Sequence, residues 1–477
     1  MMITPTRSVI YCKETEKGTK MAEHIKKVPK RILSRLMSSL SAGVVPRSGA
    51  PYIAIGRQDE IESLLSDLDR VADGDASMRL LIGRYGSGKS FLIQLMRGYA
   101  LDRGFVSADC DLSTERKLCG TNGAGIATYR ELMRNLATKA SPDGGALPLI
   151  LSSWISDIKA SVLNEGLSID SPEFDSAVRA KIHASVRKLE SGVGGFDLAL
   201  VLSTYLDACE ADDEIKKSAC LRYLRGEFAN KTEARAAIHG ISSVIGDDNW
   251  YDSIKLICRL VTSIGYKGLV VFIDECVNLY KIPNRISREN NYEKLLMMFN
   301  DTLEGRAENL MLVFGGTPQF LEDRRRGLFS YEALRSRLSD GKYDTGKYKN
   351  MIGPVIRLRR LSDNELYALI LRVTSLHAEH YSWTPRVTNE DAQAFLTAAT
   401  SAAGADLMIT PREIIRDYIS VLNILYQNPD ATFESVIGDG ISFTPDAEAG
   451  ADEAPAEVTA DAEVKHVSAF NPEDIII

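Results

Sequence analysis

The stretch Gly83-Arg-Tyr-Gly-Ser-Gly-Lys89-Ser90 decides what kind of fold this chain can adopt. It follows the apolar run Leu80-Leu-Ile82 and precedes a helical pattern that continues to about residue 101. Gly86 and Gly88 leave the backbone amides open, and the dipole of the following helix favours an anion at that point. The spacing predicts a strand, a phosphate-binding loop and a helix, which form the first half of an α/β nucleotide-binding core.

The residues of this loop have distinct expected roles in binding a nucleoside triphosphate. Lys89 would reach the β- and γ-phosphates, and the hydroxyl of Ser90 would coordinate Mg²⁺. The loop contacts that we expect are Gly83, Tyr85, Gly86, Ser87, Gly88, Lys89, Ser90 and Phe91. A chance glycine turn is the alternative, and the flanking strand and helix argue against it. The expected ligands are therefore ATP and Mg²⁺.

A second motif, Leu269-Val-Val-Phe-Ile-Asp274-Glu275, supplies two carboxylates. Its apolar run predicts a strand buried on both faces, and the carboxyl ends of such strands are where open α/β sheets bind ligands. Asp274 would hold Mg²⁺, directly or through water, and Glu275 would orient and polarise the attacking water. Together with the phosphate loop, this pair predicts an ATPase that produces ADP and phosphate.

Two further positions are candidates for contact with the γ-phosphate. Thr317 ends a strand predicted over 310–314, and it could bond the γ-phosphate or the water if that strand lies beside the Asp-Glu strand. Capping the helix that begins at Pro318 is an equal alternative. In Thr410-Pro-Arg412-Glu413, the threonine is the expected N-cap of a helix, and Arg412 inside its first turn could close over the γ-phosphate.

Two arginines near the end of a short predicted helix could act between subunits. Either Arg335 or Arg337 could neutralise transition-state charge on the nucleotide of a neighbouring chain, as an arginine finger does. An exposed surface helix is the alternative for each of them. If one acts in this way, the protein assembles into a homo-oligomer.

The rest of the chain divides by composition and hydrophobic period. Strands are predicted over 78–82, 105–111, 269–273, 310–314 and 355–358. Residues 113–265 show mainly helical patterns and no clear strand. We therefore expect an α/β fold, with a parallel-sheet core over 51–362 that carries this helical insertion, and a C-terminal helical lid over 363–440.

The two ends of the chain have biased compositions. Residues 1–22 and the acidic segment 441–477 are expected to be disordered. Residues 23–50 predict a basic amphipathic helix and a linker. This helix either docks on the domain with a solvated basic face or contacts a nucleic acid or a partner.

Charge and cysteine content limit the function classes. The net charge of −8 comes from residues 446–477, which hold nine acidic residues and one lysine, so the remaining body is balanced. Binding to DNA would therefore need a local basic patch. Seven cysteines without a CxxC motif, no signal peptide and no apolar run of ~18 residues predict a cytoplasmic protein without a membrane segment.

These motifs in this order resemble the AAA+ ATPases, in the clade shared with origin-recognition and STAND-type ATPases. That clade has a Gly-Arg element ahead of the phosphate loop, which Gly56-Arg57 matches. The resemblance implies a RecA-like parallel-sheet core, and it implies that Ile55, Gly56 and Arg57 contact the adenine.

A closer resemblance extends from about residue 31 to about residue 426. The segments Val44-Val-Pro-Arg47, Ile273-Asp-Glu-Cys-Val-Asn-Leu-Tyr-Lys-Ile282, Phe314-Gly-Gly-Thr-Pro-Gln-Phe-Leu321 and Ser330-Tyr-Glu-Ala-Leu-Arg-Ser-Arg337 are similar to those of the BREX-type ATP-binding proteins (BrxD-like). These proteins occur in bacterial and archaeal antiphage cassettes, often beside a helicase. The resemblance implies ATP binding, hydrolysis and a role in phage defence.

We therefore expect an ATPase that couples hydrolysis to remodelling of DNA or of a partner such as a helicase. A nucleotide-gated switch with slow turnover, which recruits an effector, is the competing class. A third class is an origin-recognition-like DNA-binding ATPase. It would need a winged-helix module after the lid, and only about 50 residues follow position 426.

Overall fold

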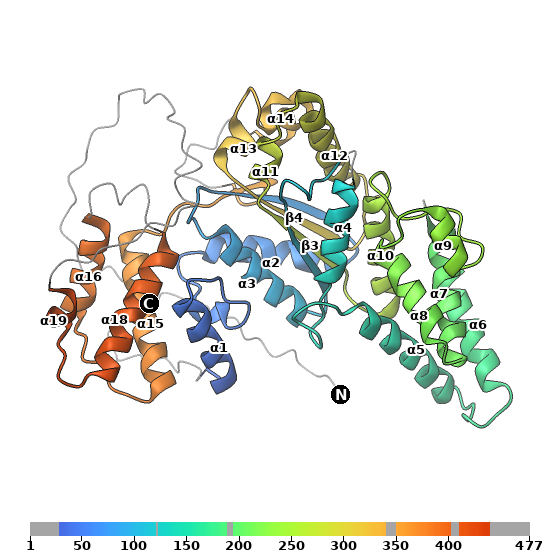
Figure 1. Cartoon of the computed structure of the whole chain (residues 1–477), viewed down its shortest axis with the longest axis horizontal. Coiled ribbons are helices and arrows are strands. Elements are labelled where there is room, and N and C mark those ends of the chain that lie inside the picture. The colour runs from blue at the N-terminus through green and yellow to red at the C-terminus, as the bar shows by residue number, and fades with distance from the viewer. Residues whose placement is uncertain (1–27, 121–122, 188–193, 340–349, 402–409, 439–477) are drawn as a thin grey trace.

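Five short strands form one parallel sheet in the computed structural model of the chain, which describes residues 28–120, 123–187, 194–339, 350–401 and 410–438. The spatial order of the strands is β2-β3-β4-β1-β5 (Figure 1). The strands are β1 (Ser77–Ile82), β2 (Val106–Asp111), β3 (Leu269–Asp274), β4 (Leu310–Gly316) and β5 (Val355–Arg357). All pairs are parallel, and every strand overlaps its predicted range, so the α/β class is confirmed.

Helices cover both faces of this sheet. The helix α2 (Gln58–Ala72) and the helix α3 (Lys89–Asp102) pack on one face. The short element η1 (Ala50–Ile53) precedes α2. The elements α11 (Val277–Tyr280) and α12 (Arg285–Leu303) follow β3, and α13 (Pro318–Glu322), η2 (Leu328–Ser330) and α14 (Glu332–Leu338) follow β4. In Figure 1, α11 to α14 lie together above the sheet.

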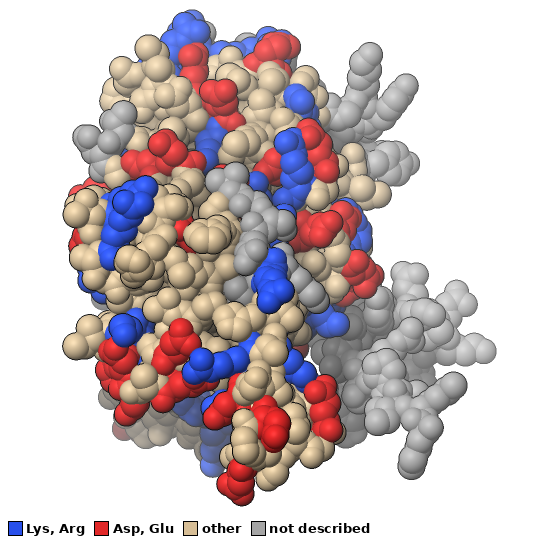
Figure 2. Space-filling model, turned by 90° about the vertical axis from the view of Figure 1, so that its right-hand side faces the viewer, with Lys and Arg blue, Asp and Glu red and all other residues tan. Residues whose placement is uncertain are grey.

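The segment between β2 and β3 is helical in its described parts, as predicted. It contains α4 (Ala124–Arg134), α5 (Leu147–Asn164), α6 (Phe174–Arg187), α7 (Gly195–Glu210), α8 (Glu214–Leu224), α9 (Lys231–Ala237) and α10 (Trp250–Ile264). The helices α4 and α10 lie beside the sheet, and α5 to α9 extend away from it (Figure 1). On the face shown in Figure 2, basic and acidic side chains are interspersed, as expected for a body of balanced charge.

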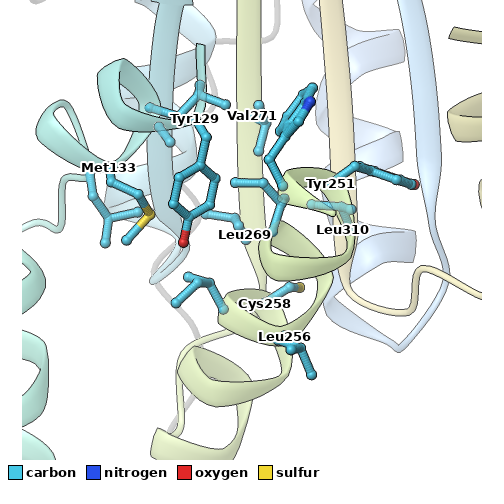
Figure 3. Packing of buried hydrophobic residues seen from close by; sticks show 14 of the residues in the cluster. Tyr129, Met133, Tyr251, Leu256, Cys258, Leu269, Val271 and Leu310 are labelled. Atoms are coloured by element: carbon cyan, nitrogen blue, oxygen red, sulfur yellow. The ribbon is translucent and has the colours of Figure 1, made fainter. Parts of the chain in front are cut away.

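The strand β3 is buried on both faces, as its unbroken apolar run predicts. Leu269 and Val271 belong to the cluster that α4 and α10 form on one side of the sheet (Figure 3). Val270 and Phe272 belong to the cluster that α2 and α3 form on the other side. Each of these four side chains is at most 1% exposed, so polar side chains are confined to the carboxyl end of the strand.

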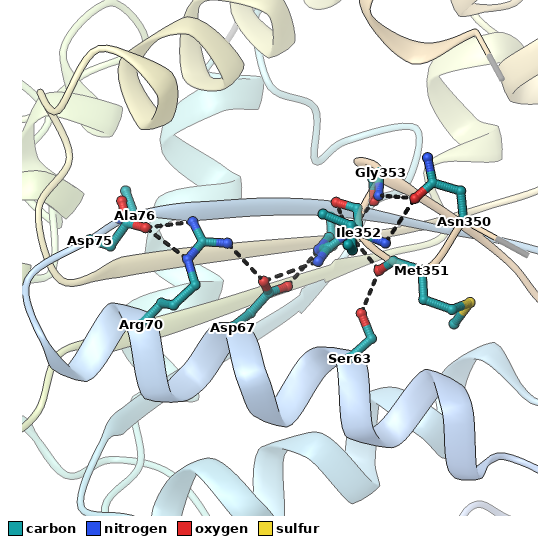
Figure 4. A network of polar contacts seen from close by, with 10 residues as sticks. Ser63, Asp67, Arg70, Asp75, Ala76, Asn350, Met351, Ile352 and Gly353 are labelled. Carbon is teal, nitrogen blue, oxygen red and sulfur yellow. Dashed lines mark hydrogen bonds and ion pairs between the residues drawn. The ribbon is translucent and has the colours of Figure 1, made fainter. Parts of the chain in front are cut away.

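A buried arginine holds the edge strand β5 against β1. Arg79 lies within β1, and its guanidinium donates to both carboxylate oxygens of Asp67 on α2, at 2.5 and 3.0 Å. It also donates to the backbone carbonyls of residues 351–353, just before β5. The hydroxyl of Ser63 donates to the first of these carbonyls at 2.6 Å (Figure 4). The network therefore ties α2, β1 and the approach to β5 together.

The first helix packs with the last helices rather than with the sheet. α1 (Lys30–Ser41) buries Leu33, Leu36, Met37 and Leu40 in a cluster shared with α15 (Asp363–Tyr381) and α18 (Pro411–Gln427). The helices α16 (Asn389–Ser401) and α19 (Phe433–Ile437) complete this group. The exposed side of α1 carries Lys30, Arg31 and Arg35. The basic helix is thus docked with its charged face in solvent, and its docking site is the C-terminal helices.

Further predictions concern the ends of the chain, membrane-spanning helices and the cysteines. The segments predicted to be disordered, 1–22 and 441–477, lie outside the described residues. Among the residues that are described, no helix has the length and apolar character needed to cross a bilayer. The six cysteines in the described ranges are free thiols.

Candidate nucleotide site

The phosphate loop follows β1 and ends in the first turn of α3. Gly86 and Gly88 have left-handed backbone conformations, with φ of 74° and 87°, which glycine adopts without steric cost. Gly88 is the N-cap of α3, and no side chain caps this helix end. The N–H groups of the first turn are therefore available to an anion, where the helix dipole also attracts negative charge.

The first two residues of α3 connect the two predicted motifs. The ammonium group of Lys89 donates to the carbonyl oxygens of Gly83 at 2.9 Å and of Arg84 at 3.2 Å. The hydroxyl of Ser90 donates to Oδ2 of Asp274 at 2.7 Å, across 184 residues of sequence. These groups meet because β1 and β3 are parallel and end at the same edge of the sheet, with only β4 between them.

The two carboxylates after β3 have different surroundings. Asp274 is 6% exposed, and its Oδ1 accepts a hydrogen bond from the N–H of Glu275 at 2.9 Å. Glu275 has a φ of 57°, a left-handed conformation that costs a non-glycine residue about 1 kcal/mol or more. Backbone strain of this kind is concentrated at functional sites. Glu275 also lines the pocket beside the loop, so the two neighbouring carboxylates are available for different tasks.

Gly315 on β4 provides the space for the Asp274 side chain. A Cβ atom at this position would lie 2.1 Å from Oδ1 of Asp274, closer than any real Cβ contact. The carbonyl of Gly315 also accepts a hydrogen bond from the N–H of Cys276 at 2.9 Å. The hydrogen bond between Ser90 and Asp274 therefore requires glycine at position 315 of β4.

We expect Gly315→Ala to displace the Asp274 carboxylate and to break its contact with Ser90. The added methyl overpacks the sheet, at a cost of about 1–3 kcal/mol. Urea unfolding should show the loss of stability, and the increase in ATP affinity that Mg²⁺ produces should become smaller. Gly98→Ala on α3 is the matched control, because no atom lies within 4 Å of its Cβ position. Equal stability and an equal Mg²⁺ effect in both variants would contradict this account.

A third carboxylate, Asp111, lies at the same edge and is not among the predicted residues. It ends β2 and pairs in register with Asp274 on β3. The surrounding protein atoms and the neighbouring charge of Asp274 raise its pKa, although the residue keeps an exposed surface. A strand that ends in a carboxylate was visible in Val106-Ser-Ala-Asp-Cys-Asp111. Nothing in the sequence indicates, however, that β2 is the neighbour of β3.

A pocket opens beside the loop, where the core meets the C-terminal helices. The predicted site residues that line it are Ile55, Arg57, Tyr85, Gly86, Ser87, Gly88, Lys89, Ser90, Phe91, Glu275 and Arg412. The predicted site residues that do not line it are Gly56, Gly83, Asp274, Thr317, Arg335 and Arg337. Apolar residues that were not predicted complete the wall, and they are Leu40, Val44, Val45, Pro46, Ile53, Leu361, Leu369 and Ile415. Their separation along the chain explains why no local pattern indicated them.

Of the three residues expected at the adenine, two reach the pocket. Ile55 and Arg57 line it, whereas Gly56 faces Glu365 on α15. A Cβ atom at Gly56 would lie 2.3 Å from Oε1 of Glu365. Glycine at this position therefore permits close packing against the start of α15, at a φ of 71°.

The guanidinium of Arg57 is hydrogen-bonded to the protein. Its Nη2 donates to the carbonyl of Ser87 in the phosphate loop at 2.6 Å, and to the carbonyl of Arg359 at 2.5 Å. Arg57 is only 4% exposed. Burial lowers its pKa, and the nearby carboxylate of Glu60 opposes this shift. The structure thus places Arg57 in the pocket wall, with Nη2 directed at the two carbonyls and Nη1 3.7 Å from Oε1 of Glu60.

The beginning of α18 lies directly on the phosphate loop. Thr410 caps this helix by accepting the N–H of Glu413, and a proline occupies the first turn, as predicted. A Cβ atom at Gly86 would lie 2.7 Å from Cγ2 of Thr410, so the loop and the helix end are in contact. Arg412 lines the pocket from this position. Its contact with a γ-phosphate remains a prediction.

Thr317 follows β4, which does lie beside the Asp-Glu strand. Its hydroxyl accepts a hydrogen bond from the N–H of Phe320 at 3.3 Å and caps α13. The capping alternative is therefore confirmed. A contact of Thr317 with the phosphate or the water remains a prediction.

Arg335 and Arg337 lie on α14, away from the pocket of their own chain. Arg335 pairs with Glu332 at 2.5 Å, and Arg337 donates to the carbonyl of Ala333 at 2.8 Å. The side chain of Arg335 is 40% exposed. A role as an arginine finger would require a second subunit, and it also remains a prediction.

Comparison with known proteins gives one family. The family model described as BREX system ATP-binding protein BrxC/D matches residues 28–440 of the chain. A search of curated protein sequences with this chain found no match.

Proposed function

The chain belongs to the BREX system ATP-binding protein BrxC/D family, and on this premise we propose that it is a Mg²⁺-dependent ATPase that remodels DNA or a partner protein. ATP binding and a place in a BREX defence system follow from the family itself. The observation that carries the step from binding to hydrolysis is the 2.7 Å contact between Ser90 and Asp274, next to Glu275 in the pocket.

The pocket suits a nucleoside triphosphate. Its apolar wall, which includes Val45 and Pro46, suits a base, and the loop amides with Lys89 suit phosphates. One buried polar atom of the wall, Oγ of Ser87, has no hydrogen-bond partner within the described residues. Buried polar groups are nearly always satisfied, so this hydroxyl favours a polar ligand.

Ser90 and Asp274 suit Mg²⁺. This ion prefers oxygen ligands and uses few protein groups beside phosphate oxygens and water. One hydroxyl and one carboxylate, with oxygen atoms 2.7 Å apart, are such a donor set. When bound, Mg²⁺ would neutralise negative charge on the phosphates.

The side chains of this chain would divide the remaining work. Glu275 would orient the attacking water and accept its proton as the bond to phosphorus forms. The ammonium group of Lys89 would bind the β- and γ-phosphates and hold them in position for the attack of water. Arg412 would contact the γ-phosphate, and Arg335 or Arg337 of a neighbouring subunit would neutralise the charge of the transition state. Thr317 would hold the water if the cap of α13 opens.

We further propose that the protein has the AAA+ organisation, with a core over 51–362 and a lid over 363–440. The contact between Thr410 and Gly86 supports this organisation, because it places the start of α18 against the phosphate loop, as a lid requires. The segment after α1 lines the same pocket, so α1 would move with the lid. An arginine supplied by a neighbour would make the active form an oligomer.

The same contact also favours the second candidate, a nucleotide-gated switch. A lid that rests on the loop can report whether nucleotide is bound even when turnover is slow. In that case ATP binding would change the lid and recruit an effector, such as a helicase of the defence system. The two candidates share the binding site and differ in the rate of hydrolysis.

Steady-state ATP hydrolysis by the purified protein, with and without duplex and single-stranded DNA, tests the proposal. We expect Mg²⁺-dependent release of phosphate that DNA or a partner increases. Tight ATP binding with negligible turnover under all conditions would contradict the remodelling ATPase and leave the switch. Absence of ATP binding would contradict both.

A further inference from the structure

A single buried side chain connects the phosphate loop to the segment that leads into the C-terminal helices. Nη2 of Arg57 donates at 2.6 Å to the carbonyl of Ser87 and at 2.5 Å to the carbonyl of Arg359. Ser87 belongs to the loop, and Arg359 lies between β5 and α15. The two acceptors come from distant parts of the sequence. They are joined only because β5 lies next to β1, whose end carries the loop.

The bond to Ser87 controls which way one peptide group of the loop faces. In the trans peptide between Ser87 and Gly88, the carbonyl and the N–H point in opposite directions. When Arg57 holds the carbonyl, the N–H of Gly88 is directed away from Arg57. Gly88 has a φ of 87°, and glycine reverses such a peptide easily because both signs of φ are open to it. The loop therefore needs an external restraint, and Arg57 is in position to supply it.

The segment that contains Arg359 is itself held by an ion pair and hydrogen bonds to the start of α15. The guanidinium of Arg359 donates to both carboxylate oxygens of Glu365, at 2.5 and 2.6 Å. Glu365 also accepts the N–H of Ser362 at 2.8 Å in the capping box of α15. Partial burial opposes ionisation of this carboxyl, but the bonds from Arg359 and Ser362 lower the pKa of Glu365 to about 2. The start of α15 is thus fixed to the segment that Arg57 holds.

We propose that Arg57 is a positioning residue that couples the phosphate loop to the C-terminal helices. This inference rests on the proposed nucleotide site and adds a regulatory connection to it. Arg57 holds the loop amides in the orientation that receives phosphate. A change in the loop is passed through the same guanidinium to Arg359 and the first turn of α15. The apolar wall of the pocket, and not Arg57, would then recognise the adenine.

Arg57→Met tests this role, because the variant keeps the aliphatic stem and removes the donors. We expect its affinity for MgATP and for inorganic tripolyphosphate to fall by the same factor, about tenfold or more. A contact between Arg57 and the base would weaken MgATP alone. Arg57→Lys should recover part of the affinity for both ligands, because its ammonium can reach at least one carbonyl. Unequal factors for the two ligands, or unchanged affinities, would overturn the proposal.

Hydrogen exchange of the peptide that covers the start of α15 tests the coupling itself. We expect MgATP to slow exchange there in the wild-type protein, and this effect to vanish in Arg57→Met at saturating nucleotide. Arg103→Met is the matched control, since Arg103 also joins a carbonyl and a carboxylate, those of Leu65 and Asp69, but far from the loop. Equal protection in Arg57→Met and the wild type would overturn the coupling.

Glu365→Gln provides an independent arm if Arg57→Met does not fold. It loosens the segment beyond Arg359 and leaves the loop contacts in place. We expect the affinity for MgATP to stay within about twofold while the protection of α15 is reduced; unchanged protection would overturn the coupling. If the wild-type protein binds neither MgATP nor tripolyphosphate, the proposed function fails first, which is a different result from normal binding that Arg57 does not influence.

Discussion

Replacing Glu275 with glutamine is expected to abolish ATP turnover while ATP remains bound. The side chain keeps its size and its place in the pocket, but an amide cannot accept a proton from the attacking water. General base catalysis contributes about 10²- to 10⁴-fold to such reactions, so kcat should fall by about that factor. The dissociation constant for MgATP should change little, because Lys89, Ser90 and the loop amides are untouched.

Phosphate release under saturating MgATP and equilibrium binding of a fluorescent ATP analogue would measure the two quantities. Glu289→Gln is the matched control, because Glu289 is a surface carboxylate on α12 that pairs with Arg285. Its turnover should equal that of the wild type. If Glu275→Gln hydrolyses ATP at the wild-type rate, another group activates the water, and the assignment of Glu275 is wrong.

Asp67→Ala is expected to cause the largest loss of stability among single substitutions in the network around β5. Asp67 is 2% exposed and holds two of the donors of Arg79, which is 5% exposed. Removing one partner of a buried ion pair leaves an uncompensated charge, at a cost of about 3–5 kcal/mol. The midpoint of urea unfolding should fall accordingly, and β5 should exchange its amide protons faster.

Asp69→Ala, two residues along the same helix, is the matched control. Its carboxylate is 70% exposed and pairs with Arg103 at the surface. Exposed pairs of this kind contribute about 0–1 kcal/mol, so the midpoint should barely move. Similar midpoints for the two variants would show that Arg79 finds other compensation, for example from the carbonyls of residues 351–353.

The parts of the site that could be predicted are those that local chemistry determines. The phosphate loop, the carboxylates after β3 and the cap at Thr410 each depend on residues a few positions apart. The structure places all three as expected in relation to their strand or helix. Asp111 and the roles of Gly315 and Gly56 could not be predicted in this way. Each depends on which strand or helix lies next to it.

Arg57 also shows that a local sequence pattern cannot predict contacts between distant segments. The Gly-Arg element indicates that the residue is near the nucleotide, and the structure does place it in the pocket wall. Its hydrogen-bond partners are 30 and 302 residues away in sequence, so no local pattern could name them. The docking of α1 on α15 and α18 is a comparable case, because an amphipathic pattern shows that a face is buried without showing against what.

The α/β class, the positions of the five strands, the helical character of the segment between β2 and β3, and the strand–loop–helix of the phosphate-loop motif could all be predicted from the sequence. These follow from hydrophobic period, glycine conformation and helix capping, which act over a few residues. The strand order, and the pocket that residues between 40 and 57 and between 361 and 415 line together with the phosphate loop, could not be predicted in this way. Strand order and helix docking depend on the burial of apolar surface between segments far apart in sequence, and this burial is non-directional and leaves no local signal.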